Sequence, residues 1–239
     1  MAADGDGAPP RLVIAGSYEG GLHGWTASET DDGDVRLSLR FSFGAHQGCC
    51  RCVATNAHVP RAQPLLLSGG DDELVRVYSL KSFRQIGELS RHTGTVTALA
   101  FCGSKHAASA AADGAIVLWR LADWACVHVL GGHDAVIPSL SAHSSGRLLL
   151  SVGADRTLRL WDLTEGRSAY VTRTKGAATK VVWAPARDAY RRPRRNLVAR
   201  NPRIRGLATS WPRRRLPGIA TSWPRPPRTS HVVAAASAD

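Results

Sequence analysis

Apolar and polar residues alternate along most of the chain in short runs, and glycine, serine or aspartate separates one run from the next. Apolar side chains recur at every second position, for example at Ile116 and Leu118, and again at Leu158 and Leu160. A period of two is that of a strand with one face toward a core, whereas a helix repeats at three and four residues. The pattern therefore predicts an all-β protein built from short strands.

The predicted strands fall into a repeat in which particular residue types return with the strands. His92 and His133 lie 41 residues apart, and Asp113 and Asp155 lie 42 apart. In each copy a serine precedes the aspartate by four residues and a tryptophan follows it by six. The two complete sets are His92, Ser109, Asp113 and Trp119, and His133, Ser151, Asp155 and Trp161. A period of this length, with histidine early and tryptophan late, is typical of the four-stranded blades of a β-propeller.

Two further copies of the pattern are less regular. One begins near His46 and has tyrosine where the complete copies have tryptophan; its set is Ser68, Asp72 and Tyr78. The other, residues 12–25, is a degenerate half-blade with Glu19 in the place of the aspartate. Residues 180–185 look like the first strand of one more blade. Together these segments predict an incomplete propeller of about four blades, each a four-stranded antiparallel sheet, over residues 11–185.

Each set of residues admits two chemical interpretations. Serine, histidine and aspartate form the triad of many hydrolases, so an esterase-like enzyme using His92, Ser109 and Asp113 is one hypothesis. However, a triad needs no duplicate 41 residues further on, and no Gly-x-Ser-x-Gly elbow precedes a helix. In the structural interpretation, aspartate accepts hydrogen bonds from turn amides and from histidine, and serine joins histidine to the indole N–H. We favour it, and we expect no enzyme activity, no cofactor and no small-molecule substrate.

The cysteines raise the question of a metal site. Cys49, Cys50 and Cys52 lie close together, but a structural zinc site usually needs a second cysteine or histidine pair, and none follows. They fall where the first strand of a blade is expected, so neighbouring thiols would point to opposite faces of the sheet. We expect no metal here. The five cysteines of the chain are an odd number, which is typical of reduced thiols.

Composition and charge divide the chain into regions. No apolar run approaches about 18 residues, so we expect no membrane span, and residues 1–10 look like a disordered leader. The formal net charge of +12 comes almost entirely from residues 186–239, which hold 13 arginines and two aspartates. The rest of the chain has 18 Lys or Arg against 17 Asp or Glu. The net charge therefore does not predict a basic blade surface.

The region 186–239 is rich in arginine and proline and lacks the blade pattern, so we expect a disordered, low-complexity tail. Its arginine clusters are candidates for nuclear import or for binding RNA; they comprise Arg191, Arg192, Arg194, Arg195, Arg213, Arg214 and Arg215. One hypothesis is that this tail makes the chain an RNA-binding form. The alternative is that the tail is an aberrant transcript end and that the chain is a truncated, non-functional product.

Several blocks of sequence resemble the p21-activated-kinase-interacting WD-repeat family. They are residues 12–19, 68–80, 122–127 and 150–170, in the same order as in that family. The resemblance implies a seven-bladed, non-enzymatic propeller of the nucleus and nucleolus that is required for assembly of the large ribosomal subunit. It also implies partners among pre-ribosomal assembly factors, and a p21-activated kinase whose activation is restrained. The similarity covers roughly residues 11–185 and stops where the tail begins.

Overall fold

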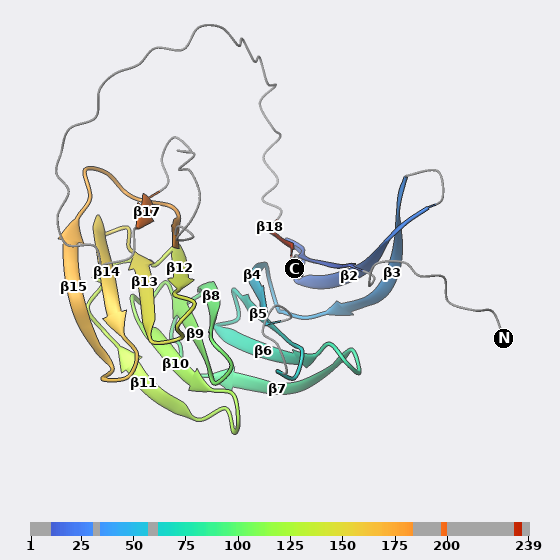
Figure 1. Cartoon of the computed structure of the whole chain (residues 1–239), viewed down its shortest axis with the longest axis horizontal. Helices are drawn as coiled ribbons and strands as arrows, with labels where there is room; N and C mark the ends of the chain where they lie inside the picture. The colour runs from blue at the N-terminus through green and yellow to red at the C-terminus, as the bar shows by residue number, and fades with distance from the viewer. Residues whose placement is uncertain (1–10, 31–33, 57–61, 184–196, 200–231, 236–239) are drawn as a thin grey trace, which may run out of the picture.

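The computed structural model describes residues 11–30, 34–56, 62–183, 197–199 and 232–235. Within these ranges all regular secondary structure is β, and most of it forms four antiparallel sheets of four strands each. The sheets follow one another in chain order around an arc (Figure 1). The predicted all-β fold with about four blades is confirmed. None of the described residues forms a helix with the length and apolarity needed to span a membrane.

We number the blades in chain order and give their strands from the inner edge outward. Blade 1 contains β18 (Val232–Ala235), β1 (Arg11–Gly16), β2 (Gly21–Glu29) and β3 (Val35–Gly44). Blade 2 contains β4 (Cys50–Thr55), β5 (Leu65–Gly70), β6 (Leu74–Ser79) and β7 (Arg84–Ser90). Blade 3 contains β8 (Val96–Cys102), β9 (His106–Ala111), β10 (Ile116–Arg120) and β11 (Cys126–Leu130). Blade 4 contains β12 (Ser139–Ala142), β13 (Leu148–Val152), β14 (Thr157–Asp162) and β15 (Arg167–Arg173).

Most strands lie where the alternating pattern predicts them, and the exception has a local cause. In blade 4 the apolar residues Val136 and Ile137 precede the first strand, but β12 begins only at Ser139. Pro138 has no backbone N–H, so it cannot donate a hydrogen bond to the neighbouring strand. The inner strand of blade 4 therefore has four residues, against seven in β8 of blade 3.

One irregularity occurs between the third and the outer strand of every blade. The register between the third and the outer strand shifts immediately before Trp25, Tyr78, Trp119 and Trp161. The extra, unpaired residue lies in the outer strand of each blade: Arg40, Ile86, Val127 or Ala169. A bulge bends the strand that carries it and increases the local twist, so each outer strand changes direction opposite the aromatic residue that ends the repeat.

The hydrophobic core lies between the blades. Val75 and Val77 of blade 2 pack in one cluster with Val117 and Trp119 of blade 3. The opposite face of blade 3 packs against blade 4 in the next cluster, which includes Trp161. Because successive strand residues point to opposite faces, each central strand supplies both of its neighbouring clusters. Each blade is thus stabilised chiefly by the blades on either side of it.

Two short strands lie in the region where the sequence shows no blade pattern. β17 (Leu197–Ala199) pairs in parallel with β16 (Val181–Trp183), which packs beside β12. β18 pairs antiparallel with β1, with Val13 opposite Ala235, and supplies the inner strand of blade 1. The expectation of a tail without strands therefore does not hold for these seven residues. Their sequences, Leu-Val-Ala and Val-Val-Ala-Ala, contain three valines, a residue that favours strands.

Candidate functional site

The structure assembles the predicted set of blade 3 into one hydrogen-bonded cluster. His92 Nδ1 lies 3.0 Å from Asp113 Oδ2, and His92 Nε2 lies 2.8 Å from Ser109 Oγ. The indole N–H of Trp119 donates to the same Ser109 Oγ at 2.8 Å. Asp113 also accepts the backbone N–H groups of Thr93 and Ala115. The cluster therefore connects the turn between β9 and β10 with the segment before β8.

Blade 4 repeats this geometry closely. His133 Nδ1 lies 2.9 Å from Asp155 Oδ2, and His133 Nε2 lies 2.7 Å from Ser151 Oγ. Trp161 donates its indole N–H to Ser151 Oγ at 2.8 Å. Thr157 adds a backbone and a hydroxyl hydrogen bond to Asp155. Both complete sets that the spacing predicts are thus clusters in the structure.

Blade 2 contains the same cluster with one bond missing. His46 Nδ1 lies 2.7 Å from Asp72 Oδ1, and His46 Nε2 lies 2.7 Å from Ser68 Oγ. Tyr78 occupies the place of the tryptophan, but its buried hydroxyl has no hydrogen-bond partner among the described residues. The phenol therefore fills the space of the indole without replacing its hydrogen bond.

The proton positions follow from the donors available in each cluster. In blades 3 and 4 the indole N–H can only donate, so the serine oxygen accepts it and the serine O–H is left to donate to histidine Nε2. Histidine Nδ1–H then donates to the aspartate, which requires a neutral ring. Burial lowers the pKa of His46 and of His133, although the neighbouring aspartate opposes this change. The neutral tautomer is therefore the one that this environment favours.

The aspartates remain charged. Burial alone would raise the pKa of Asp155, but hydrogen bonds from Thr157 and His133 outweigh it and lower the pKa to about 2. The pKa of Asp113 is also lowered, because hydrogen bonds from two turn amides and from His92 outweigh the effect of burial. A carboxylate that accepts several hydrogen bonds holds a turn in place more firmly than a neutral acid does.

This geometry does not suit nucleophilic catalysis. Ser109 and Ser151 have the hydrogen-bond order of a hydrolase triad, yet both are 0% exposed. A nucleophile must lie about 3 Å from a substrate carbonyl, and a serine enclosed between strands cannot reach one. Its oxygen is also engaged by an indole N–H. The clusters therefore serve to hold the blades together.

An arginine contact was not predicted from the sequence. Arg76, four residues after Asp72, donates to that carboxylate at 2.8 Å and to the backbone carbonyl of Ala45, just before His46. Arg159 occupies the same place in blade 4 and donates to the carbonyl of Gly132, just before His133. An arginine four residues after the aspartate occurs in blades 2 and 4, whereas blade 3 has Val117 there, so the sequence offered a signal for this contact in two of the three clusters.

The remaining sequence-based candidates have different outcomes. Cys50 and Cys52 are buried, and burial raises the pKa of both thiols, to about 12 for Cys50, which disfavours the thiolate that a metal needs. Among the described residues no group of three or more His, Cys, Asp or Glu side chains has the arrangement of a metal site. The arginine clusters at residues 191–195 and 213–215 lie outside the described residues. Their role in nuclear import or RNA binding stays a prediction.

The sequence of this chain is similar to those of known repeat proteins. Residues 37–79, 83–120 and 124–162 match the family described as WD domain, G-beta repeat. The chain is 36% identical over 178 residues to the p21-activated protein kinase-interacting protein 1-like of Gallus gallus, covering 74% of this chain and 46% of that protein. It is 32% identical over 218 residues to Protein MAK11 of Saccharomyces cerevisiae, covering 80% of this chain and 50% of that protein.

A solved structure agrees with the architecture. One chain in the crystal structure of the mitotic checkpoint complex superposes with a TM-score of 0.63, over 74% of this chain and 52% of that chain. The sequence identity is 18%, so this likeness concerns the fold alone. The chain spans about half the length of the curated relatives described above.

Proposed function

Because this chain belongs to the WD domain, G-beta repeat family, we propose that it is a non-enzymatic scaffold that binds other proteins through its blade surfaces. One observation carries the proposal. Every serine, histidine and aspartate of the repeat sets is engaged in a cluster that holds strands together. The residue types with catalytic potential are thus used for cohesion, and the exposed turns and outer strands remain for contact with partners.

The process we propose is assembly of the large ribosomal subunit, with the chain in the nucleus and nucleolus and with pre-ribosomal assembly factors as partners. The support is the family resemblance of residues 12–19, 68–80, 122–127 and 150–170. Similarity to the kinase-interacting protein and to Protein MAK11 over about three quarters of the chain supports the same assignment.

Sedimentation tests this proposal directly. A tagged chain expressed in cells should migrate with precursors of the large subunit on a sucrose gradient. Removing magnesium from the lysate, which takes ribosomal particles apart, should move it to lighter fractions. Free migration at the top of the gradient under both conditions would contradict the proposal.

A second candidate function is negative regulation of a p21-activated kinase, and it is favoured by the name of the Gallus gallus relative. Purified chain should then bind the regulatory segment of such a kinase and slow its activation. Kinase activation at an unchanged rate with the chain in excess would contradict this second function and would leave the ribosomal one standing.

A further inference from the structure

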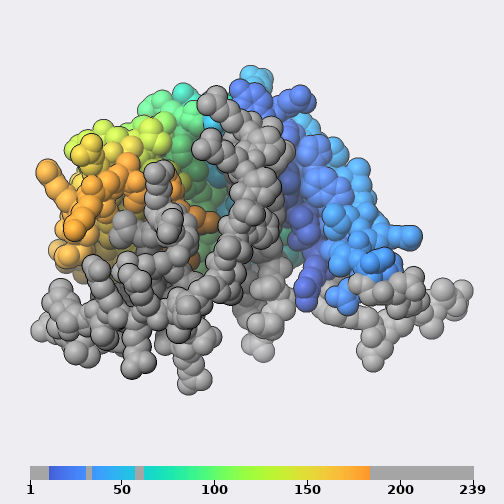
Figure 2. Space-filling view, turned by 90° about the horizontal axis from the view of Figure 1, so that it is seen from above, coloured from blue at the N-terminus to red at the C-terminus, as the bar shows by residue number. Residues whose placement is uncertain are grey.

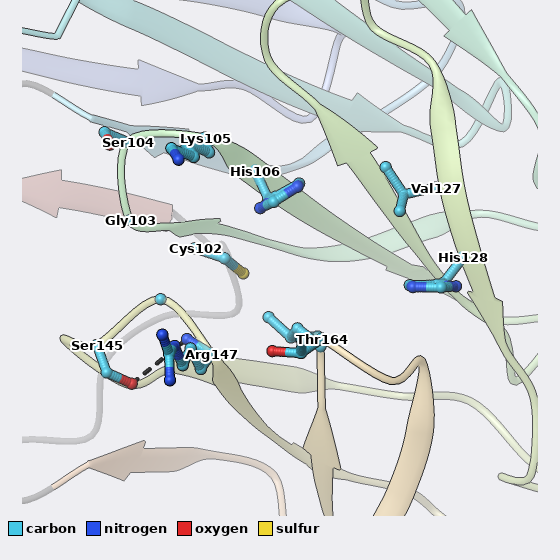
Figure 3. A pocket seen from close by; sticks show the side chains of 12 residues that line it. Cys102, Gly103, Ser104, Lys105, His106, Val127, His128, Ser145, Arg147 and Thr164 are labelled. Carbon is cyan, nitrogen blue, oxygen red and sulfur yellow. Dashed lines mark hydrogen bonds between the residues drawn. The ribbon is translucent and has the colours of Figure 1, made fainter.

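A hollow of about 470 Å³ lies between blades 3 and 4, on the side of the molecule that carries the β8–β9 and β12–β13 turns. The two turns touch, since a Cβ added to Gly103 would lie 3.4 Å from the Cα of Gly146. Residues from both turns, from β11 and from the segment after β14 line the hollow (Figure 3). It is thus formed by the junction of two blades.

The lining of this hollow is cationic. Lys105, His106, His128 and Arg147 face it, and no carboxylate is among its described lining residues (Figure 3). Lys105 and Arg147 are exposed and make no ion pair with any residue that the structure describes. The pKa of His106 is lowered by its burial and, in addition, by its electrostatic interaction with Arg120, Lys105 and His128. The positive charge around the hollow is therefore uncompensated.

The nearby arginines outside the hollow differ in this respect. Arg120 pairs with Asp123 at 3.1 Å, and Arg167 pairs with Glu165. Three hydroxyl groups also line the hollow. Those of Ser104 and Thr164 make no hydrogen bond to the described residues, whereas that of Ser145 is hydrogen-bonded to His143. Two free cations beside free hydroxyl donors have the chemistry of a phosphate site.

We propose that this hollow binds a phosphate group carried by a side chain of a partner protein, with Lys105 and Arg147 as the main ligands. The inference rests on the scaffold function proposed above, because it specifies the chemistry by which one partner is recognised. An arginine and a lysine that meet a phosphate dianion form charge-assisted hydrogen bonds, which are about twice as strong as neutral ones. An unphosphorylated segment would lack this contribution.

A protein segment fits the surface better than RNA does. Among the lining residues described, none is Phe, Tyr or Trp, whereas single-stranded nucleic acid is usually held by stacking on such rings. A second hollow, of about 640 Å³, lies beside the first, shares Lys105 and His106 with it, and is lined by Gln63 and Leu65. An extended peptide that lies across both hollows would place its phosphate in the cationic one.

Binding of peptide libraries to the full chain tests the inference. The probes are a peptide library degenerate around one phosphoserine, its unphosphorylated counterpart, and a single-stranded RNA oligonucleotide. We expect retention of the phosphorylated library alone, and at least a tenfold loss of affinity for the selected phosphopeptides in the Lys105→Gln, Arg147→Gln double variant. Arg167→Gln, which removes an exposed but paired arginine of blade 4, should bind as the unmodified chain does.

Two results would overturn the inference: equal retention of both peptide libraries, or stronger retention of the RNA than of the phosphopeptides. Unchanged affinity in the double variant would also overturn it, provided that its circular dichroism matches the unmodified chain. Phosphopeptide binding without association with pre-ribosomal particles would contradict the proposed ribosomal function alone. Association with the particles that is insensitive to both substitutions, together with no phosphopeptide binding, would contradict this inference alone.

Discussion

The serine in each cluster is the residue on which the other side chains converge. Ser109 accepts the indole N–H of Trp119 and donates to His92, so its hydroxyl satisfies two groups that are out of reach of water. A buried donor or acceptor that loses its partner costs roughly 1–3 kcal/mol, more than the bond itself contributes to stability. The hydroxyl therefore has a larger effect on stability than its size suggests.

Replacing this serine with alanine should cost more in blade 3 than in blade 2. Ser109→Ala leaves the Trp119 indole N–H and Nε2 of His92 without a partner, and we expect the free energy of unfolding to fall by about 3 kcal/mol. Ser68→Ala leaves only Nε2 of His46 without a partner, because the Tyr78 hydroxyl makes no hydrogen bond to that serine, and the loss should be about 1.5 kcal/mol. Urea denaturation followed by circular dichroism measures both values, and equal losses would contradict this account.

Stability should also depend on pH through the histidines. The pKa of His46 and of His133 in the folded chain lies below the ordinary value of 6.5, so the unfolded chain takes up protons first as pH falls. The free energy of unfolding should therefore decrease from pH 7.5 to pH 5.5. The aspartates, whose pKa is lowered, contribute a separate loss only as pH falls through 3.8 and below.

The control for this pH dependence is His133→Gln, which keeps a polar side chain but cannot titrate. We expect a lower stability at pH 7.5 and a shallower decrease toward pH 5.5 than in the unmodified chain. Denaturation curves at four or five pH values between these limits would measure the slope. Stability that is constant or that rises as pH falls would contradict the assignment of neutral histidines.

At the scale of elements, the turn between the second and third strand of each blade has a common backbone conformation. The residue after the acidic one has a positive φ in all four blades: Gly20, Glu73, Gly114 and Arg156 have φ values of 78°, 65°, 77° and 61°. This left-handed conformation favours glycine, and it destabilises other residues by about 1–2 kcal/mol. Two of the blades therefore keep a strained residue at a position where the other two have glycine.

Exchanging residues at this turn position should change stability in opposite directions. Glu73 is exposed, so Glu73→Gly removes strain without removing packing and should stabilise the chain by about 0.5–1 kcal/mol. Gly114→Ala should destabilise it by more than about 1 kcal/mol, because the new Cβ would lie 2.5 Å from the carbonyl oxygen of His133. Thermal and urea unfolding would measure the stability of both variants. A loss of stability in Glu73→Gly would contradict the interpretation that the backbone of Glu73 is strained.

The elements also show what the sequence could and could not predict. The spacing of Ser109, Asp113 and Trp119 was sufficient to predict their cluster, because strand length and turn length are fixed within a blade. The bulges opposite the aromatic residues were not predicted, since the extra residue lies in the outer strand of each blade, which is mostly exposed and has little apolar alternation to interrupt. β18 was not predicted either, because residues 232–235 carry no serine, aspartate or tryptophan at the blade spacing. Its partner, β1, lies more than 200 residues away in the chain.

At the scale of the whole molecule, the blades at the two ends of the arc have only one neighbouring blade among the described residues. In Figure 2 the blue end, which carries blade 1, lies opposite the orange end, which carries β15. One face of blade 1 packs against blade 2 through Ile14, Leu22 and Phe41. Its other face displays apolar residues of β3, and a surface of this kind is an aggregation or docking surface in most proteins.

The exposed residues of β3 define that surface. Leu37 and Leu39 are 56% and 60% exposed, and they alternate with polar residues along the strand, so they lie on one face. Trp25 pairs directly with Leu39 across the sheet, and Val13 pairs with Trp25 in the same row. Apolar side chains from three adjacent strands thus form one continuous area, and its burial against a second copy would be favourable at about 25 cal/mol for each Å².

The 239-residue chain should therefore self-associate in a way that depends on this face. We expect its elution volume in size-exclusion chromatography to decrease as the loaded concentration rises. The double variant Leu37→Lys, Leu39→Lys should elute as a monomer, because two charges cannot be buried at a copy-to-copy contact without a large desolvation cost. Ile86→Lys is the matched control: it replaces an apolar residue of the outer strand of blade 2 that is 47% exposed, and it should associate as the unmodified chain does. A sharp monomer peak for the unmodified chain at every concentration would show that the face of blade 1 is not an association surface.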